Sequence, residues 1–441
     1  MKKNIIKVAF VGAGQRGPWL LKQLAKMSDV QVMAVCDKHE DRTLKMQEIV
    51  EKEGKPTPFT TQNYKEIIAR GGIDAAVIAT DWNMHIPIAI DFMEAGINPA
   101  FEVGGCDSVE ECWELVRTYR KTGVECMMLE NCCYAKKEMQ IFNMVKQGLF
   151  GDIIHCDGGY MHDLREEILA GKEKRQYRLR NYMNRNCDNY PTHQLGPIAK
   201  ILNINHGNRF VSLTSMASRA AGIKQYMKEH EIENKDLLDT EFMQGDVVMT
   251  MIKCARGETI TLTLDTTLPH FYSRNYNVCG TKGRYDENTN CIYCQELDPT
   301  QDPEGRKADY YNNMEKYSEE YKHPLWKEYE EVGVRAGHGG MDWLVLRAFI
   351  ESMKAGTKPP VDAYDAAAWM CISPLSEQSI ERGSMPVDIP DFTYGQWIEE
   401  YTPVPSKYSL DVVYEDRSIP IYPEDCGEDD KAPSLYSAEL G

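Results

Sequence analysis

The sequence predicts an α/β protein in which a parallel sheet with crossover helices is followed by a second, mixed domain. Over the first 130 residues, short apolar runs of β type alternate with amphipathic helical patterns, which is typical of parallel strands joined by helices. From about Cys132 the pattern changes to longer helical segments, and then to β-rich stretches at Gly245–Cys254 and Thr259–Asp265. These two sequence patterns predict two domains.

The elements follow in chain order. The apolar runs predict strands near Lys7–Val11, Val30–Cys36, Ala75–Ala79, Asn98–Glu102 and Glu125–Met128. The patterns between them predict helices around Pro18–Lys26, Asp41–Lys52, Tyr64–Arg70, His85–Ala95 and Ser108–Thr122. A polar segment from about Gln295 to Glu331 precedes a late helix that begins near Gly340. We expect domains at residues 1–130 and 131–400, and an acidic C-terminal tail or arm at 401–441.

Composition excludes several classes of protein. The 441 residues are 42% hydrophobic and 27% charged, which is ordinary for a globular protein with a sizeable core. The net charge of -18 and the lack of a long basic run argue against a nucleic-acid partner. No apolar run approaches the ~20 residues of a membrane helix, and the N-terminal run leads into a glycine motif, so we expect no membrane partner and a cytoplasmic protein.

The 14 cysteines are scattered through apolar segments, which indicates buried thiols rather than a disulfide framework. Cys291 and Cys294 form a single CxxC pair with no second pair at the spacing of a zinc site. We therefore expect no metal.

A glycine motif follows the first predicted strand and opens a helix. Gly12 permits a tight turn, Gly14 lets the backbone approach a pyrophosphate, and Gly17 allows the helix to pack closely on the strand. Asp37 lies twenty residues after Gly17, at the end of the second strand, where a carboxylate accepts hydrogen bonds from ribose hydroxyls and repels a 2′-phosphate. Strand, turn, helix, strand and acid in this order predict a Rossmann domain that binds NAD rather than NADP.

Two further segments follow predicted strands, at the edge of the sheet where ligands bind in open α/β sheets. Thr80–His85 follows the third strand and Phe101–Gly105 follows the fourth. His85 could equally be an ordinary residue at the start of a helix, and Trp82 a packing residue.

At this point the chain resembles the glucose-fructose oxidoreductase/inositol dehydrogenase superfamily, in which a Rossmann domain precedes an α+β domain with a large, mostly antiparallel open sheet. Dehydrogenases of that group carry Glu-Lys-Pro after the fourth strand, whereas this chain has Glu102-Val103-Gly104. A plain alcohol dehydrogenase therefore fits less well.

A closer resemblance, to the NAD-dependent α-N-acetylgalactosaminidases of glycoside hydrolase family 109, rests chiefly on Tyr190-Pro191-Thr192-His193 and Gly337-His338-Gly339-Gly340-Met341-Asp342. Further matching runs are Glu130 to Tyr134, Gly158 to Arg165, Asn184 to Asn186, Tyr272 to Arg274 and Gly280 to Gly283.

When the functional positions of the family are matched to this sequence, the resemblance implies two sets of site residues. Besides the glycines, the cofactor contacts would be Gln15, Arg16, Asp37, Trp82, Asn83, Met84, His85, Glu102, Val103, Asn131 and Tyr190. The sugar site would be lined by Tyr160, Arg178, Tyr190, Pro191, Thr192, His193 and Tyr272. Arg178 is placed by its spacing to Tyr190, and Arg180 is the alternative. Gln194 stands where the family has glycine.

The resemblance also implies a reaction: transient oxidation of a glycoside at carbon 3, elimination of the aglycone, addition of water and return of the hydride, without net redox. Tyr160 is the candidate for removal of the carbon 2 proton. Tyr190 and His193 would surround the hydroxyl being oxidised, and Arg178 would be a charged hydrogen-bond partner. We expect a small glycoside as substrate and a homo-oligomer. The alternatives are a sugar or cyclitol dehydrogenase with net oxidation, and a non-catalytic sensor of sugar or nucleotide.

Overall fold

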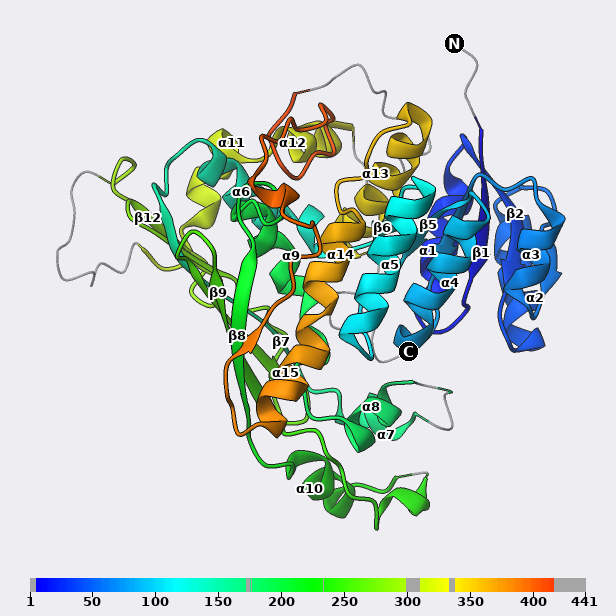
Figure 1. The fold of residues 1–441 in the computed structure, drawn as a ribbon, viewed down its shortest axis with the longest axis horizontal. Coiled ribbons are helices and arrows are strands. Elements are labelled where there is room, and N and C mark those ends of the chain that lie inside the picture. Colours follow the sequence, from blue (N-terminus) through cyan, green and yellow to red (C-terminus); the bar gives the residue numbers. More distant parts are fainter. Residues whose placement is uncertain are drawn as a thin grey trace.

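The computed structural model describes residues 5–171, 175, 177–232, 234–298, 310–332 and 338–415. Two sheets stand beside each other, the N-terminal one in blue and the larger C-terminal one mainly in green (Figure 1). The predicted fold class is confirmed: a parallel Rossmann sheet precedes a mostly antiparallel sheet with helices.

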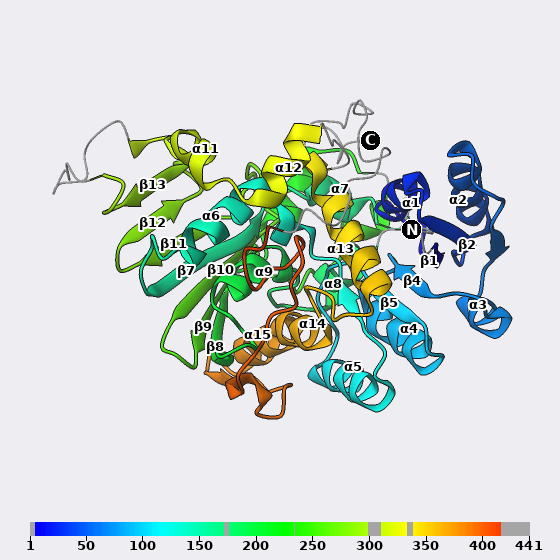
Figure 2. The same ribbon diagram turned by 90° about the horizontal axis from the view of Figure 1, so that it is seen from above.

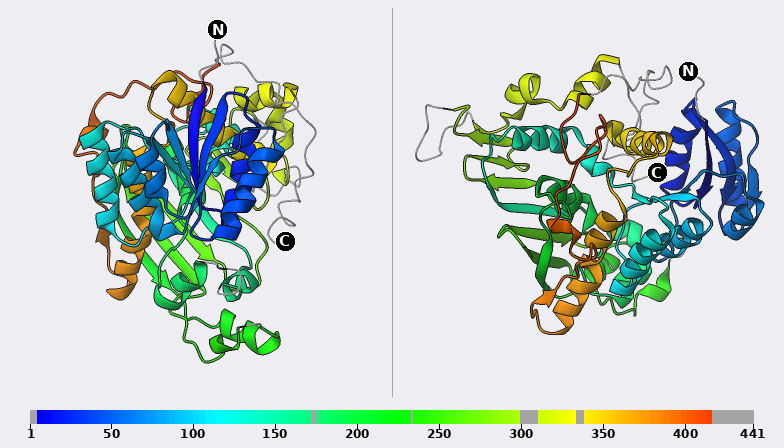
Figure 3. Two further views of the ribbon diagram at one scale, coloured as in Figure 1. Left: turned by 90° about the vertical axis from the view of Figure 1, so that its right-hand side faces the viewer. Right: turned by 45° about the horizontal axis from the view of Figure 1, so that its top comes forward.

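The first sheet has the strand order β3-β2-β1-β4-β5-β6, and every neighbouring pair is parallel. Its strands and helices are β1 (Ile6–Val11), α1 (Gly17–Lys26), β2 (Val30–Cys36), α2 (Glu40–Lys52), β3 (Phe59–Thr61), α3 (Tyr64–Arg70), β4 (Ala75–Ile78), α4 (Trp82–Glu94), β5 (Asn98–Phe101), α5 (Val109–Thr122) and β6 (Met127–Met128). Helices cover both faces of this sheet, as the left view of Figure 3 shows. The central strands are therefore buried on both faces, which explains their continuous apolar runs.

The second sheet has eight strands in the order β13-β12-β11-β7-β10-β9-β8-β14. Their bounds are β7 (Ile153–Met161), β8 (Phe210–Ala217), β9 (Val247–Cys254), β10 (Thr259–Asp265), β11 (Asn277–Gly280), β12 (Gly283–Asp286), β13 (Cys291–Cys294) and β14 (Val387–Asp388). β7 and β10 run parallel, and the other neighbouring pairs are antiparallel. Along β9 buried residues alternate with exposed ones, so one face of the sheet is packed and the other is open.

Helices of the second part cover the packed face of that sheet and reach the Rossmann sheet (Figure 2). The helices are α6 (Lys136–Lys146), α7 (Arg165–Leu169), α8 (Arg178–Asn184), α9 (Thr192–Ile201), α10 (Gly222–Glu229), α11 (Ser318–Tyr321), α12 (Pro324–Val332), α13 (Met341–Ala355), α14 (Ala363–Met370) and α15 (Ile372–Glu381). Short 3-10 turns are η1 (Asn131–Tyr134), η2 (Lys235–Leu237), η4 (Met314–Tyr317), η5 (His338–Gly340) and η6 (Gln396–Ile398). A buried ion pair joins α13 to the turn before β2, since Arg347 Nη1 lies 2.8 Å from Asp29 Oδ1.

Three elements differ from the sequence-based expectations. β3 was not expected, because three residues are too few to show a periodicity. α4 begins at Trp82 rather than near His85. α9 begins at Thr192 rather than near Gly196, because Pro191 precedes it with φ -76° and ψ -21°, a backbone conformation that leads directly into a helix. Thr192 and His193 therefore lie in the first turn of α9.

The start of the expected C-terminal arm packs on the second part of the molecule. Tyr408 and Leu410 are buried, and the Tyr134 hydroxyl donates to the Tyr408 carbonyl at 2.8 Å. Residues 416–441 of the expected tail lie outside the described residues. Among the helices of the described part of the chain, none is both long and apolar enough to cross a bilayer.

Candidate active site at the junction of the two sheets

The glycine motif forms a tight turn between β1 and α1. Gly12 has φ +101°, and a Cβ there would lie 2.4 Å from the Ala79 carbonyl oxygen. A Cβ at Gly17 would lie 2.1 Å from the Gly12 carbonyl oxygen, so both positions require glycine to fold. Gly14 differs, because a Cβ there would meet nothing within 4 Å. Open space above Gly14 at a helix N-terminus fits the pyrophosphate of a dinucleotide.

Asp37 follows β2 and is buried beside this turn. Its Oδ2 accepts from the Ala13 amide at 2.7 Å, and its Oδ1 accepts from the His39 amide at 2.9 Å. Each carboxylate oxygen has a second lone pair, so Asp37 can brace the glycine turn and still accept a ribose hydroxyl.

Arg16 links the Rossmann domain to α13. Its Nε lies 3.0 Å from Glu102 Oε1, and its Nη1 donates to Asp342 Oδ2 at 2.7 Å. Asp342 also accepts from Asn131 at 2.8 Å and contacts His338 Nδ1 at 2.7 Å. Burial alone would raise the pKa of Asp342, but Arg16 and His338 overcome this effect and hold it well below its usual range. Three expected cofactor contacts, Arg16, Glu102 and Asn131, thus meet around one ionised carboxylate.

The segment Trp82, Asn83, Met84 and His85 forms the first turn of α4. Trp82 is buried against Gly104, where a Cβ would lie 2.3 Å from the indole. His85 is also buried, and its Nε2 lies 3.0 Å from the Thr80 carbonyl. Burial lowers the pKa of His85 to about 4, so this imidazole is neutral at physiological pH. Gln15 is exposed and Val103 buried at the same edge of the sheet.

Aromatic rings from both parts of the molecule pack into one group. The ring centroid of Tyr190 lies 5.3 Å from that of Trp82 and 4.4 Å from that of Tyr160. His193 lies 4.8 Å from Tyr190 and 5.6 Å from Tyr160, and Tyr272 lies 6.5 Å from Tyr160. The expected sugar-site residues on β7, on α9 and before β11 are therefore neighbours, next to the first turn of α4.

Arg178 lies on this aromatic group, whereas Arg180 does not. The Arg178 guanidinium carbon is 5.2 Å from the Trp82 ring centroid and 5.3 Å from that of Tyr190, and Nε pairs with Glu167 at 2.9 Å. Its Nη1 is buried and has no hydrogen-bond partner among the described residues. Arg180 instead pairs with Asp107, with 61% of its side chain exposed. Of the two alternatives, only Arg178 has a buried donor beside Tyr190.

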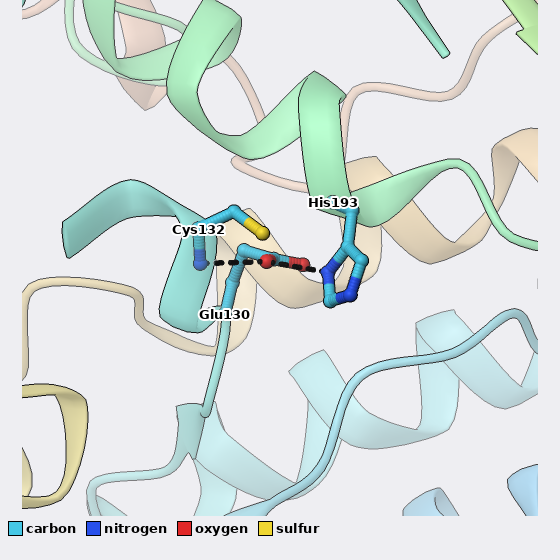
Figure 4. A group of neighbouring side chains, drawn as sticks. All are labelled: Glu130, Cys132 and His193. Atoms are coloured by element: carbon cyan, nitrogen blue, oxygen red, sulfur yellow. Dashed lines mark hydrogen bonds and ion pairs between the residues drawn. The ribbon is translucent and has the colours of Figure 1, made fainter. Parts of the chain in front are cut away.

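His193 is held by Glu130, which precedes η1 (Figure 4). His193 Nδ1 lies 2.9 Å from Glu130 Oε1, and Nε2 lies 3.4 Å from the Tyr190 hydroxyl. Burial alone would lower the pKa of His193, but Cys132 and Glu130 beside it raise that pKa to about 10. Burial likewise acts to raise the pKa of Glu130, and His193 lowers it instead. At neutral pH the pair is an imidazolium bonded to a carboxylate.

Glu130, Cys132 and His193 have side chains of the kinds that bind transition metals, and their ligand atoms lie within 4.8 Å of one another. The 2.9 Å contact between Nδ1 and Oε1 is a hydrogen-bond distance that requires a proton between the two atoms. A cation would have to replace that proton, so we describe the group as a charge-assisted hydrogen bond.

Two residues of the site had no role assigned from the sequence. Glu130 and Asp342 lie in runs that carry the family resemblance, but both are 0–1% exposed acids, and His193 and Arg16, with which they pair, are far away in the chain. A buried carboxylate cannot be told from an exposed one by local pattern. The remaining expected residues, Pro191 and Thr192, are buried where α9 begins.

Comparisons with known proteins divide the chain in two. A family model described as "Oxidoreductase family, NAD-binding Rossmann fold" matches residues 6–130. One described as "Glycosyl hydrolase 109, C-terminal domain" matches residues 134–399. The chain belongs to glycosyl hydrolase family 109.

Relatives within this family share most of its length. A glycosyl hydrolase family 109 protein of Stenotrophomonas maltophilia is 37% identical over 416 residues, covering 89% of this chain and 90% of its own. A protein of Tannerella forsythia named alpha-N-acetylgalactosaminidase is 36% identical over 418 residues, covering 90% of this chain and 88% of its own. This member of family 109 is thus a glycoside hydrolase with an NAD-binding domain.

Solved structures share the fold of this family 109 member at low identity. Myo-inositol 2-dehydrogenase from Lactobacillus plantarum matches with a TM-score of 0.62 at 16% identity, over 88% of this chain and 100% of its own. Levoglucosan dehydrogenase in complex with NADH and L-sorbose matches with a TM-score of 0.62 at 17% identity, over the same shares of the two chains.

Proposed function

We propose that this protein hydrolyses α-N-acetylgalactosaminides or related small glycosides, using bound NAD without net redox. The observation that carries the proposal is the packed group of Tyr160, Tyr190 and His193, which adjoins Trp82 of the Rossmann domain. The names of relatives such as that of Tannerella forsythia supply the sugar.

When bound, NAD+ would supply a reversible hydride acceptor for carbon 3 of the sugar. The open space at Gly14, Asp37 beside it, and the Arg16 network would hold the dinucleotide. Tyr190 and His193 would bind the hydroxyl on carbon 3, and Tyr190 in its deprotonated form would take the hydroxyl proton as the hydride leaves. Tyr160 would remove the proton from carbon 2. Tyr272, Pro191 and Thr192 complete the wall of the sugar site.

The charge of His193 suits this chemistry. Removal of the carbon 2 proton, once carbon 3 is a ketone, places negative charge on the carbon 3 oxygen. An imidazolium fixed by Glu130 stabilises such a charge without reorganisation. Nη1 of Arg178, which is buried and has no partner among the described residues, offers a second donor beside Tyr190.

The test is release of an aryl group from an aryl α-N-acetylgalactosaminide by the purified NAD-bound protein. We expect many turnovers without accumulation of NADH, deuterium on carbon 2 of the product in heavy water, and unchanged activity after dialysis against EDTA. Stoichiometric NADH from free sugars would instead favour a dehydrogenase. Dinucleotide binding without turnover of either substrate would favour a sensor, and product without label at carbon 2 would exclude elimination.

A further inference from the structure

The register of the second sheet places Arg274 beside Tyr160. Met161 and Ser273 form an antiparallel bridge, in which the amide of each donates to the carbonyl of the other at 3.1 and 2.9 Å. Farther along, β7 and β11 pair Asp157 with Asn277, which continues the same register. Extending the Met161–Ser273 bridge by one residue places Arg274 opposite Tyr160.

Side chains alternate between the faces of a strand, so Tyr160 and His162 share a face with Tyr272 and Arg274. The rings of His162 and Tyr272 meet at a centroid distance of 5.3 Å, as this register requires. Directly opposed residues in an antiparallel pair have Cβ atoms about 5 Å apart. Arg274 is thus the cross-strand neighbour of the side chain proposed to act at carbon 2.

Arg274 keeps its charge in a buried position. Its Nη2 pairs with Glu138 Oε1 at 2.6 Å, and only 12% of the side chain is exposed. Its Nε and Nη1 are buried and have no hydrogen-bond partner among the described residues, and the same holds for Glu138 Oε2. Glu138 comes from α6, whereas Arg274 lies on the segment paired with β7. The carboxylate therefore leaves two of the three guanidinium nitrogens unused.

We propose that Arg274 is a positioning residue that acts through Tyr160, by favouring the phenolate form of this tyrosine when it removes the carbon 2 proton. In that step the phenolate oxygen takes the proton, the C2–H bond breaks, and its electron pair moves towards the carbon 3 ketone to form an enolate. The enolate then expels the aglycone oxygen. This inference rests on the proposed function.

Other charged or titratable groups lie around Tyr160, and Cys132, Glu138, Tyr272 and Glu287 act on the charge of Arg274. They are Arg178 from α8, Tyr190 just before α9, His193 on α9, His162 just after β7 and Tyr272 on the paired segment. Arg178 lies over the rings of Trp82 and Tyr190 and is paired with Glu167. Arg274 supplies a second cation, from the segment bridged to β7.

The size of the effect follows from Coulomb's law. A unit charge about 6 Å away, at an effective dielectric constant of about 20, shifts a titration by about two pH units. The carboxylate of Glu138, which pairs with Arg274, offsets part of this effect, so we expect a shift of about one pH unit. The charge of Arg274 should move the titration of Tyr160 to lower pH, and that of Glu138 should move it to higher pH.

The experiment compares Arg274→Met with Arg274→Lys in the NAD-bound protein, using kcat/KM for an aryl α-N-acetylgalactosaminide across pH. Activity that needs the phenolate form of Tyr160 rises with pH. The feature to be measured is this rise of kcat/KM on the acid side of the pH profile, its acid limb. We expect R274M to move the limb up by about one pH unit. R274K keeps the charge and should leave the limb within a few tenths of a unit of its original position.

Glu138→Gln is the matched control: it keeps Arg274 and should shift the pH profile in the opposite direction. Loss of this carboxylate should move the acid limb to lower pH. E138Q also keeps the proposal falsifiable if R274M fails to fold, because Gln can still accept a hydrogen bond from the guanidinium.

A spectroscopic titration tests Arg274 without turnover. The ultraviolet absorbance of tyrosinate is followed against pH in the NAD-bound protein, and the Tyr160→Phe titration is subtracted to isolate Tyr160. We expect the midpoint to rise in R274M and to fall in E138Q. Unchanged midpoints and superimposable pH profiles in both variants would overturn the proposal. If the parent protein cleaves no glycoside, the proposed function fails, while these midpoints still decide whether Arg274 tunes Tyr160.

Discussion

Tyr160 is the residue on which the proposed chemistry depends most. Its ring contacts Tyr190 and His193, and it lies across the strand pair from Arg274. We predict that Tyr160→Phe lowers kcat by about 10²–10⁴, the usual contribution of a general base, with little change in the affinity for NAD. Steady-state kinetics and a fluorescence titration with NAD measure the two effects.

The matched control for that variant is Tyr64→Phe, which removes a hydroxyl bonded to Asp91 in the Rossmann domain. Y64F should keep kcat within about twofold, because Tyr64 lies on α3, whose side chains are not part of the aromatic group. Equal rates for Y160F and the parent protein would remove Tyr160 from the role of base.

The pair of His193 and Glu130 predicts how stability depends on pH. The pKa of His193 is about 10 when folded and about 6.5 when unfolded, so the folded state binds the proton more tightly. The resulting stabilisation is complete below about pH 6.5 and is lost as pH rises through about 10. We predict that the free energy of unfolding falls by about 2–4 kcal/mol from this pair over that window.

Urea unfolding at intervals between pH 6 and 10 measures this dependence, and Glu130→Gln is the comparison. Cys132 and Glu130 both raise the pKa of His193, and E130Q removes the second of them, so its stability should be lower at pH 6 and should vary less with pH. A parent protein whose stability loss over this window equals that of E130Q would contradict a charged pair.

At the scale of the element, the turn between β1 and α1 separates a folding requirement from a binding requirement. A Cβ at Gly12 would collide with the Ala79 carbonyl at 2.4 Å, on a backbone with φ +101°, whereas a Cβ at Gly14 would occupy open space. We predict that Gly12→Ala lowers Tm and abolishes NAD binding, because the turn must shift. Gly14→Ala should leave Tm unchanged without NAD and weaken NAD at least tenfold, because its methyl group takes the place of a phosphate.

Calorimetric scans with and without NAD compare the two variants. Equal losses of Tm in G12A and G14A without NAD would show that Gly14 is also needed for folding. An unchanged affinity of G14A for NAD would place the pyrophosphate elsewhere.

Helix starts were the elements least predictable from the sequence. The periodicity located α1, α2, α3 and α5 to within about one residue, but α4 and α9 begin several residues earlier than expected. In both cases the first turn is made of large or polar side chains that face the site, so apolar periodicity does not show it. His193 and Trp82 are therefore held on helices rather than on loops.

At the scale of the whole molecule, the open face of the second sheet predicts association. Met249 and Met251 on β9 are 51% and 57% exposed, and Met249 pairs with Met216 of β8, which is 64% exposed. Three neighbouring methionines on β8 and β9 form an apolar patch of the kind that packs against a partner. We propose that this face joins two copies of the chain.

Light scattering after size-exclusion chromatography tests the oligomer. We predict that the parent protein is larger than a monomer and that Met249→Glu combined with Met251→Glu shifts it towards the monomer, with the aryl glycosidase rate per chain retained. A variant with charge on the exposed α2 helix, such as Leu44→Glu, should leave the mass unchanged. A monomeric parent protein would refute the prediction.

The sequence by itself determined the Rossmann elements, the nucleotide turn with Asp37, and the residues of the aromatic group. Those features rest on short-range patterns: strand and helix periods, glycines that a turn requires, and local runs that carry a family resemblance. Tertiary structure alone decided which charges meet. Arg16 reaches Asp342, His193 reaches Glu130, and Arg274 lies opposite Tyr160 through contacts between segments far apart in the chain. Strand register and helix packing fix such contacts, and no local pattern encodes them, because they depend on the fold of the whole chain.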